Sequence, residues 1–474
     1  MWSRILLPAL LFTACASMSG SVASADTSGD AVPAAEGYSS YYSGLPLELT
    51  APEVPSIPDN TVILSDFGGV ADGVTLNTDA FRKAVSALDK QGGGHLIVPA
   101  GVWLTGPIVL KDSIDLHLEK GALVLASPDK TQFLRDDGKV TPFITASKRS
   151  DVSITGEGII DGNGEWWRGV KRSKVSDVEW KDYQRMGGTV AENGTLWYPF
   201  SLNHLPDIAP TYKEQERMRT HLVRFTDCTR VLVSGVTLQN SPKFHLVPQR
   251  CKHVSIVGVT VRCPWNAQNG DGIDLMQSTD VLVADCTVDV GDDGICLKAG
   301  GGSAALKDGP TARVLICGNT VFHAHGGFVI GSEFSGGIED VVVKDNTFSG
   351  TDTGLRFKSA PDRGGHTSRI RINNVYMSDI RDQAIIFDTS YVNVPVGESG
   401  KKSDSCDIWM PDFRDIVIDG LICRDARIGV SAQGAPECIH DITVKNSTIF
   451  YTETATSLSS PGLLDLEGLK LISW

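Results

Sequence analysis

The sequence predicts an all-β chain folded as a right-handed parallel β-helix, with an N-terminal helix that caps the coils. Two observations carry this prediction. A short phrase rich in β-branched residues recurs from about residue 150 onward. Glycine is also in excess, with 49 residues where average usage would give roughly 33. Abundant turns between many short strands are what a coiled β architecture requires.

The N-terminal residues predict an export signal. Arg4 precedes the apolar run Ile5–Phe12, and a small-residue cleavage site ends at Ala25. The residues up to Cys15 also resemble a bacterial lipoprotein signal, in which this cysteine would carry lipid. A cleaved signal over residues 1–25 and a lipid anchor at Cys15 both remain open. We therefore expect an exported protein that is periplasmic, extracellular or anchored in the outer membrane.

The next segments lead into the coils. Residues 26–60, rich in Ala, Ser, Gly and Pro, predict a flexible leader. Residues 79–88 space their apolar side chains as an amphipathic helix, and 96–103 and 114–118 read as the first strands. The open end of a solenoid must be covered for solubility, so we expect the helix to cap it.

Each copy of the repeated phrase is a short strand, a polar corner and a second short strand. The copies that begin at residues 230, 253, 280, 313, 340 and 369 follow one another by 23, 27, 33, 27 and 29 residues. So short a strand cannot bury its own face, but stacked coils can. Propeller blades need about 40 to 45 residues, and the period of helical or leucine-rich repeats is missing. A single solenoid domain over residues 61–474 therefore replaces the three or so domains that length alone suggests.

The repeat lapses twice. Between Asp161 and Arg224 about two coils' worth of sequence carries many charges and large aromatic residues, among them Trp166, Trp167, Trp180, Trp197 and Tyr198. The tryptophans could anchor a long loop or stack on sugars, and both interpretations stay open. The second lapse runs from Tyr391 to Asp412.

Charge and cysteine content narrow the function classes. The formal net charge of −14 offers no basic face for nucleic acid. There are ten cysteines, and an exported chain invites disulfides. Removing or lipidating Cys15 leaves nine, so at least one is unpaired. Four of them lie in apolar runs where buried free thiols are as plausible as bridges, namely Cys286, Cys296, Cys317 and Cys423. No Cys-x-x-Cys pair is present, which argues against structural zinc.

The second strands of four successive coils can be aligned. The aligned segments are residues 272–275, 294–297, 327–330 and 354–357. Their first apolar column (for example Ile273) and their last (for example Leu275) then point into the solenoid, and the column between them points outward. Arg356 stands in that outward column, and Lys358 follows on the same face.

Just before these strands the columns are charged. Asp271 and Asp293 share one column, and Asp292 and His325 share the next, with adjacent coils about 4.8 Å apart. Carboxylates packed this closely raise the pKa of at least one of them, which suits hydrolysis of a glycosidic bond by one acid and one base. Asp beside Gly is also common in plain turns.

We expect the neighbouring polar residues to be structural. His245 and His323 are interpreted as surface or packing residues, and Asp274 as an outward, solvated carboxylate.

At these residues the sequence resembles glycoside hydrolase family 28, the polygalacturonases, whose fold is the pectin-lyase-like solenoid. The family's four ordered motifs appear here as Asn269-Gly270-Asp271, Asp292-Asp293, Ala324-His325-Gly326 and Arg356-Phe357-Lys358. Residues 66–73 also look like the opening of such enzymes, so the likeness covers about residues 60–450. Gly270, Ala324 and Phe357 depart from the family pattern without removing a charge.

The resemblance implies a role for each catalytic residue. Asp292 would be the general acid, and Asp271 and Asp293 would hold and deprotonate the attacking water, with inversion at the anomeric carbon. His325 would support the protonation state of the acid.

The resemblance also implies substrate contacts. Arg356 and Lys358 would bind galacturonate carboxylates, and Asn269 would position the loop or a sugar hydroxyl. No metal or other cofactor is implied, and we expect a monomer whose partner is polygalacturonate or pectin. Any membrane attachment would be through the lipid anchor alone.

The expected activity is cleavage of α-1,4-galacturonosidic bonds, in the exo mode because the 161–224 insertion is long enough to wall off one end of the groove. Endo action and a rhamnogalacturonan-type hydrolase are the alternatives within the family. A calcium-dependent pectate lyase and a non-catalytic carbohydrate-binding solenoid are the alternatives outside it.

Overall fold

The computed structural model describes residues 38–199, 211–391 and 409–474, which belong to one compact unit. The predicted signal over residues 1–25, the anchor at Cys15 and the first part of the leader lie outside the described residues, so export and lipidation stay predictions. Across the described ranges, no helix combines the length and the apolar character that crossing a membrane requires.

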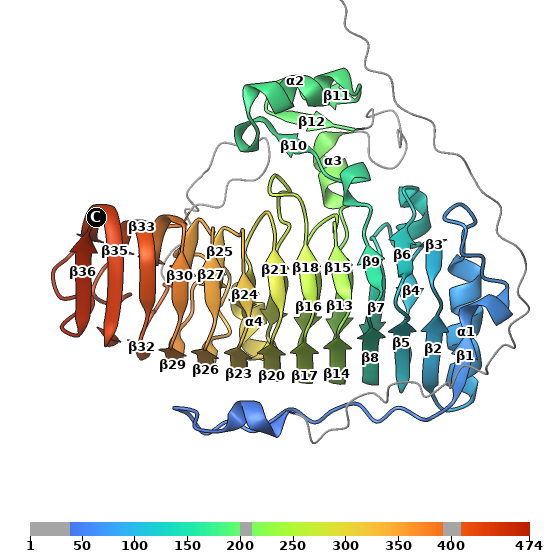
Figure 1. Cartoon of the computed structure of the whole chain (residues 1–474), viewed down its shortest axis with the longest axis horizontal. Coiled ribbons are helices and arrows are strands. Elements are labelled where there is room, and N and C mark those ends of the chain that lie inside the picture. The colour runs from blue at the N-terminus through green and yellow to red at the C-terminus, as the bar shows by residue number, and fades with distance from the viewer. Residues whose placement is uncertain (1–37, 200–210, 392–408) are drawn as a thin grey trace, which may run out of the picture. The chain divides into compact units, whose positions relative to one another are not determined.

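Parallel strands stack into coils with three faces, which Figure 1 shows as successive rungs. The first face is made by β1 (Thr61–Ile63), β2 (Gly94–Val98), β5 (Ile114–Leu118), β8 (Ser150–Gly156), β14 (Thr229–Ser234), β17 (Lys252–Val257), β20 (Thr279–Ala284), β23 (Thr311–Cys317), β26 (Ile338–Lys344), β29 (Thr367–Asn373), β32 (Ile416–Asp419) and β34 (Ile442–Lys445).

The second face follows the polar corner of each phrase. Its strands are β3 (Gly101–Thr105), β6 (Ala122–Ala126), β9 (Ile159–Asp161), β15 (Thr237–Gln239), β18 (Thr260–Arg262), β21 (Thr287–Asp289), β24 (Thr320–Val321), β27 (Thr347–Ser349), β30 (Tyr376–Ser378), β33 (Ile422–Gln433), β35 (Ser447–Leu458) and β36 (Leu469–Ser473).

The third face carries the aligned polar columns. Its strands are β4 (Ile108–Val109), β7 (Ile144–Ser147), β13 (Val223–Thr226), β16 (Leu246–Gln249), β19 (Ile273–Met276), β22 (Ile295–Lys298), β25 (Gly326–Gly331), β28 (Thr353–Lys358) and β31 (Ile380–Asp388). The last of them, β31, pairs with the second half of β33 in the next coil. The predicted right-handed parallel β-helix is confirmed.

The core is built from identical positions of successive coils. Val254, Val281, Val314 and Val341 stack in register on the first face, each at most 1% exposed. β-branched side chains fit such a pleated, buried surface. The repeated phrase therefore folds as coils because each copy supplies the same apolar positions to one continuous core.

Helices are few in the described ranges. They are α1 (Thr78–Lys90), α2 (Asp177–Arg185), α3 (Tyr212–Arg217) and α4 (Ser303–Asp308), with short 3-10 turns at Ser39–Tyr42, Leu64–Phe67, Lys130–Phe133, Gly164–Trp166 and Arg172–Lys174. The predicted amphipathic helix is α1, which buries Phe81, Ala84 and Leu88 and contacts β1 and β2. Its role as a cap stays a prediction.

The leader differs from the expected flexible segment where the structure describes it. Tyr38, Tyr42 and Leu47 pack against an apolar strip on the outer side of the first face that includes Leu282 and Leu315. An outward leucine on a strand is costly to expose, and the leader removes it from water. Residues 38–60 therefore have a partner on the solenoid, which composition alone did not reveal.

Charged residues form a ladder where each phrase begins. Asp280 pairs with Arg313, and Asp340 pairs with Arg369, in neighbouring coils. All four have positive φ, between 53° and 59°. Alternating charge lets adjacent coils place these side chains over one another without repulsion.

Within the described ranges the eight cysteines are free thiols. The four in apolar runs are buried, as one of the two open interpretations expected.

Asparagines tie the buried corners of adjacent coils. Asn319 is 1% exposed, and its Oδ1 accepts a hydrogen bond from the Cys286 backbone N–H at 2.9 Å. Its Nδ2 donates to the Val283 carbonyl at 3.0 Å and to Asn346 Oδ1 at 2.9 Å. One side chain thus satisfies backbone groups that the corner would otherwise bury unpaired.

We expect Asn319→Ala to lower the free energy of unfolding by about 2–4 kcal/mol, because it leaves a buried N–H and a buried carbonyl without partners. Thermal unfolding of the purified variant measures this. Lys120→Ala, which removes an exposed side chain, is the control and should leave the midpoint unchanged. Equal midpoints for the two variants would contradict the structural role of the asparagine.

Candidate active site

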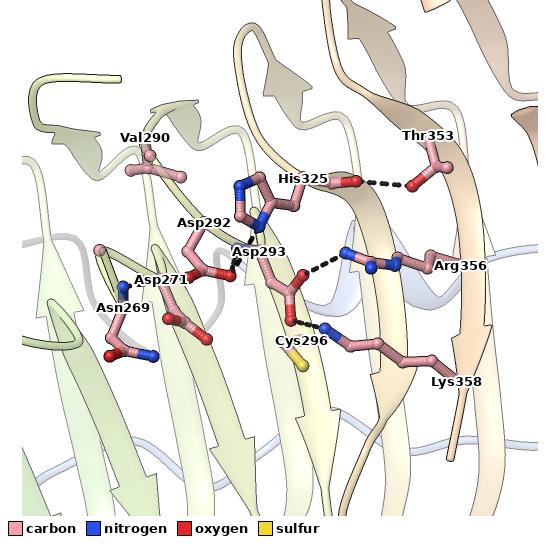
Figure 2. A network of polar contacts seen from close by, with 12 residues as sticks. Asn269, Asp271, Val290, Asp292, Asp293, Cys296, His325, Thr353, Arg356 and Lys358 are labelled. Carbon is pink, nitrogen blue, oxygen red and sulfur yellow. Dashed lines mark hydrogen bonds and ion pairs between the residues drawn. The ribbon is translucent and has the colours of Figure 1, made fainter. Parts of the chain in front are cut away.

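The predicted columns are confirmed by the strand register. Ile273 pairs with Ile295, and Ile295 pairs with Phe328 in the next coil. Val329 in turn pairs with Arg356, so the guanidinium stands in the outward column as expected. Seven predicted site residues thereby come together on the third face: Asn269, Asp271, Asp292, Asp293, His325, Arg356 and Lys358. Figure 2 shows these seven as one network.

Asp292 is held between an imidazole and a backbone amide. His325 Nδ1 lies 3.0 Å from Asp292 Oδ1, and the Asn269 backbone N–H donates to Asp292 Oδ2 at 3.0 Å. The Asn269 side chain faces elsewhere, because its Oδ1 accepts a hydrogen bond from Arg219 at 2.8 Å. Of the two interpretations of Asn269, positioning of the loop is the one the contacts favour.

Asp293 is held by two cations. Lys358 Nζ donates to Asp293 Oδ2 at 2.7 Å, and Arg356 approaches Asp293 Oδ1 at 3.4 Å. The ring of Tyr391 lies beneath both cations, 5.0 Å from Lys358 Nζ and 5.5 Å from the Arg356 guanidinium carbon. The sequence marked Tyr391 only as the start of a lapse in the repeat.

The interpretation of Asp274 as a solvated residue is wrong. Its side chain is in the outward column, but it is 0% exposed and lies 3.1 Å from Lys298 Nζ. The same ammonium is 3.6 Å from Asp271 Oδ2 and 4.0 Å from Asp293 Oδ2. The Lys298 side chain therefore covers Asp274 on the outer wall. Lys298 stands two residues beyond Cys296 on the same side of its strand.

The four carboxyl groups titrate in two opposite ways. Burial raises the pKa of Asp271, and the nearby Asp274 adds to the rise. Burial also raises the pKa of Asp274 to about 6, although Lys298 opposes it. The expected raised pKa is thus present, at Asp271 and Asp274.

Asp292 and Asp293 go the other way. Burial favours the neutral form of Asp292, but the hydrogen bond and charge of His325, with Lys358 and Lys174, outweigh it and lower the pKa. At Asp293 burial is likewise outweighed, first by Lys358 and then by Arg356, so its pKa is lowered.

The described part of the 161–224 insertion contacts the site through residues of several coils, Asn266, Gly291 and His325 among them. Its small antiparallel sheet consists of β10 (Val170–Lys171), β12 (Leu196–Tyr198) and β11 (Thr189–Val190), with α2 beside it (Figure 1). Trp167, Trp197 and Tyr198 are buried, which supports the anchoring interpretation for these three rings. Trp166 stays 45% exposed.

One lysine of the insertion reaches the predicted catalytic pair. Lys174 Nζ donates to the Gly291 carbonyl at 2.8 Å and lies 3.3 Å from His325 Nε2. An ammonium has no lone pair, so Nε2 must accept and the Nδ1–H faces Asp292. Tyr183 of α2 also accepts a hydrogen bond from Asn266 at 2.9 Å. No repeat or motif in the sequence pointed to Lys174.

The two other histidines singled out from the sequence, His245 and His323, are packing residues. His245 is fully buried, and burial lowers its pKa to about 4. Its Nε2 accepts from the Ser241 N–H, and its Nδ1 donates to the Asp271 carbonyl at 2.9 Å, which fixes the backbone of Asp271. His323 stacks on Trp265 at a ring separation of 4.4 Å.

The arrangement offers carboxyl groups of differing proton affinity beside two cations suited to an anionic ligand. One ligand atom each from Asp292, Asp293 and His325 lie within 4.8 Å of one another, a spacing that a metal ion could use. Cations already lie against two of these residues, since Lys358 and Arg356 contact Asp293 and Lys174 contacts His325. A metal ion would have to displace or repel them, whereas acid–base chemistry on an anionic substrate would not.

Comparison with known proteins gives consistent matches. Residues 184–460 match the family described as glycosyl hydrolases family 28. A probable polygalacturonase of Vitis vinifera is 32% identical over 67% of this chain and 61% of its own length. An exo-poly-alpha-D-galacturonosidase of Dickeya chrysanthemi is 30% identical over 73% of this chain and 59% of its own. The chain thus spans about three fifths of these relatives, and endo-polygalacturonases are among the further matches.

A solved structure is similar over most of the chain. The hyperthermoactive exopolygalacturonase of Thermotoga maritima superposes with a TM-score of 0.69 and 26% identity, covering 89% of this chain and 94% of that one.

Proposed function

Because this chain belongs to glycosyl hydrolases family 28, we propose that it hydrolyses the α-1,4-galacturonosidic bonds of polygalacturonate from the chain end, with inversion. The single observation that carries the proposal is that the Asp271, Asp292 and Asp293 carboxyl groups share one outer wall with Arg356 and Lys358, which both contact Asp293. A neutral glycan would have no use for two cations at the cleavage point, whereas a guanidinium and an ammonium bind a sugar carboxylate directly.

Each group then has a task. Asp292 donates a proton to the leaving oxygen, and His325 orients it through the Nδ1–H. Asp271 and Asp293 hold the attacking water and take its proton. The reactive carboxyl groups come from two adjacent coils, so their spacing is set by the strand stacking rather than by mobile loops.

Substrate binding accounts for the protonation of Asp292. In the free protein the charge of Lys358 helps to hold the pKa of Asp292 down. A galacturonate carboxylate bound by Arg356 and Lys358 neutralises that charge and adds a negative one nearby. Both effects raise the pKa of Asp292 and favour the acid form when substrate is present.

The exo mode is supported by the insertion. It is fixed to the site by Lys174 at His325, by Tyr183 at Asn266 and by Arg219 at Asn269. An insertion fixed at these points is expected to close one end of the substrate path, so that a chain end rather than the middle of a chain is bound. The chain is similar to exo-acting enzymes in sequence and in structure.

Two other functions remain as alternatives. A calcium-dependent lyase would need the acidic cluster for the cation, but Lys358 and Arg356 already neutralise Asp293. A binding solenoid would need no acid, yet Asp292 is held by two specific hydrogen bonds. That the protein acts on pectin, is exported, is a monomer and binds no nucleic acid stays a prediction.

We expect purified protein to release only galacturonate monomer or dimer from long polygalacturonate at early times, and to leave rhamnogalacturonan intact. Chromatography of the products with mass detection measures this. A ladder of mixed oligomers would contradict the exo mode while keeping the hydrolase. Ultraviolet-absorbing, unsaturated products that vanish with a chelator would replace the hydrolase by a lyase.

A further inference from the structure

We propose that Lys243 forms a second carboxylate-binding site, on the opposite side of the catalytic carboxyl groups from Arg356 and Lys358. This inference rests on the proposed function and extends it to the sugar on the other side of the scissile bond.

The position of Lys243 follows from the register. Leu246 pairs with Ile273, and the His245 N–H donates to the Asp271 carbonyl. Counting back three residues from Leu246 and from Ile295 puts Lys243 in the column of Asp292, two coils earlier. Two coils span about 10 Å. Arg356 stands two coils beyond Asp293 in the other direction, so cations flank the carboxylates on both sides.

Lys243 lacks an acidic partner. Across the residues that the structure describes, no carboxylate lies within ion-pair distance of its ammonium, and the side chain is half-buried. Its Nζ lies 5.4 Å from the centre of the Phe244 ring, which Lys298 approaches from 5.6 Å. Burial lowers the pKa of Lys243, and Arg219 adds to the effect, while Asp271 opposes it. A half-buried ammonium without an ion-pair partner is open to an anionic ligand, which would supply the missing counter-charge.

The chemistry fits a sugar carboxylate rather than a metal ion. An ammonium is a cation that can act only as a donor. A galacturonate chain presents one carboxylate per sugar, so a substrate that places one on Arg356 and Lys358 has another for Lys243 across the cleavage point. Lys243 would make binding depend on charge at both sides of the bond.

The test is calorimetric binding of trigalacturonate to Asp292→Asn protein with and without Lys243→Met. We expect the second change to weaken binding by about 10- to 100-fold at low salt, the usual worth of a charge-assisted hydrogen bond. The midpoint of thermal unfolding should stay equal or rise, because methionine removes a half-buried charge that has no ion-pair partner. Lys252→Met, in the same turn of the solenoid on the first face, should change neither.

Unchanged affinity with Lys243→Met, in a protein that binds trigalacturonate and whose parent cleaves polygalacturonate, would overturn the second site alone. A lower unfolding midpoint together with unchanged affinity would assign Lys243 a structural role. If the Asp292→Asn protein binds no galacturonate oligomer and the parent releases no sugar, the proposed function itself fails.

Discussion

Replacement of Asp292 by asparagine is expected to lower kcat on polygalacturonate by about 10³-fold, within the range for loss of a general acid. Asparagine keeps the shape of the side chain, and its Oδ1 can still accept from the Asn269 N–H, but it has no proton to give. Affinity for trigalacturonate should be unchanged or tighter, because one negative charge beside an anionic substrate is gone. Steady-state kinetics and calorimetry measure the two quantities.

Asp280→Asn is the matched control for this variant. It removes a carboxylate of the same size from the outer ladder of the first face, where Asp280 pairs with Arg313. We expect full activity. Turnover of Asp292→Asn within tenfold of the parent would contradict the assigned role. If Asp271→Asn were inactive while Asp292→Asn kept its turnover, the acid would be Asp271, whose pKa is raised in the free protein.

Replacement of Lys298 by methionine is expected to cost about 3–5 kcal/mol of stability, the usual effect of removing one partner from a buried ion pair. Lys298 is 6% exposed and lies near three carboxyl groups, of which Asp274 is the closest. Activity should also be lost, because Asp271 would lose the positive charge that opposes its protonation. Urea unfolding at fixed pH measures the stability change.

The loss should depend on pH. Burial raises the pKa of Asp274 to about 6 in the folded protein, whereas the pKa of an aspartate in the unfolded chain is about 3.9. Between these values the folded state binds more protons, so the contribution of Asp274 to stability falls as pH rises from about 4 to about 6. Without Lys298 the carboxylate has no counter-charge, and the destabilisation should be larger at pH 7.5 than at pH 4.5.

A double variant tests the cause. Asp274→Asn added to Lys298→Met removes the carboxylate left unpaired, so it should recover part of the lost stability. Lys445→Met removes an exposed lysine that pairs with Asp419 and should leave stability unchanged. A pH-independent loss, or no recovery in the double variant, would contradict the ion-pair explanation.

The coils could be predicted because one short pattern serves many residues. Apolar positions such as Val281 and Ile273 recur at fixed places in each copy, and stacking them forces the same alignment in space. The alignment in turn placed Asp292 beside His325, two residues far apart in the chain. Side chains that the repeat carries were therefore placed correctly by counting.

Residues outside the repeat could not be placed in this way. Lys174 and Tyr391 lie in segments without periodic pattern, so nothing in the sequence gave their distance from the carboxyl groups. Asp274 was misjudged for another reason. The outward direction of its side chain was predicted correctly, but Lys298 of the next coil covers it. A side chain that points outward is therefore not always in contact with water.

The packed leader shows the same limit. Tyr38, Tyr42 and Leu47 cover outward leucines of the first face. In the sequence these residues stand in a segment rich in small residues, a composition that is also typical of a free linker. A partner surface assembled from several coils leaves no local signal in the segment that covers it.

The stereochemistry of hydrolysis tests the central claim most directly. The account assigns an acid at Asp292 and a water-activating pair at Asp271 and Asp293, so water attacks the anomeric carbon from the side opposite the leaving group. Proton NMR of polygalacturonate during the first turnovers should therefore show β-anomeric reducing ends, which equilibrate later. Initial appearance of the α-anomer, or of an unsaturated sugar, would contradict this mechanism.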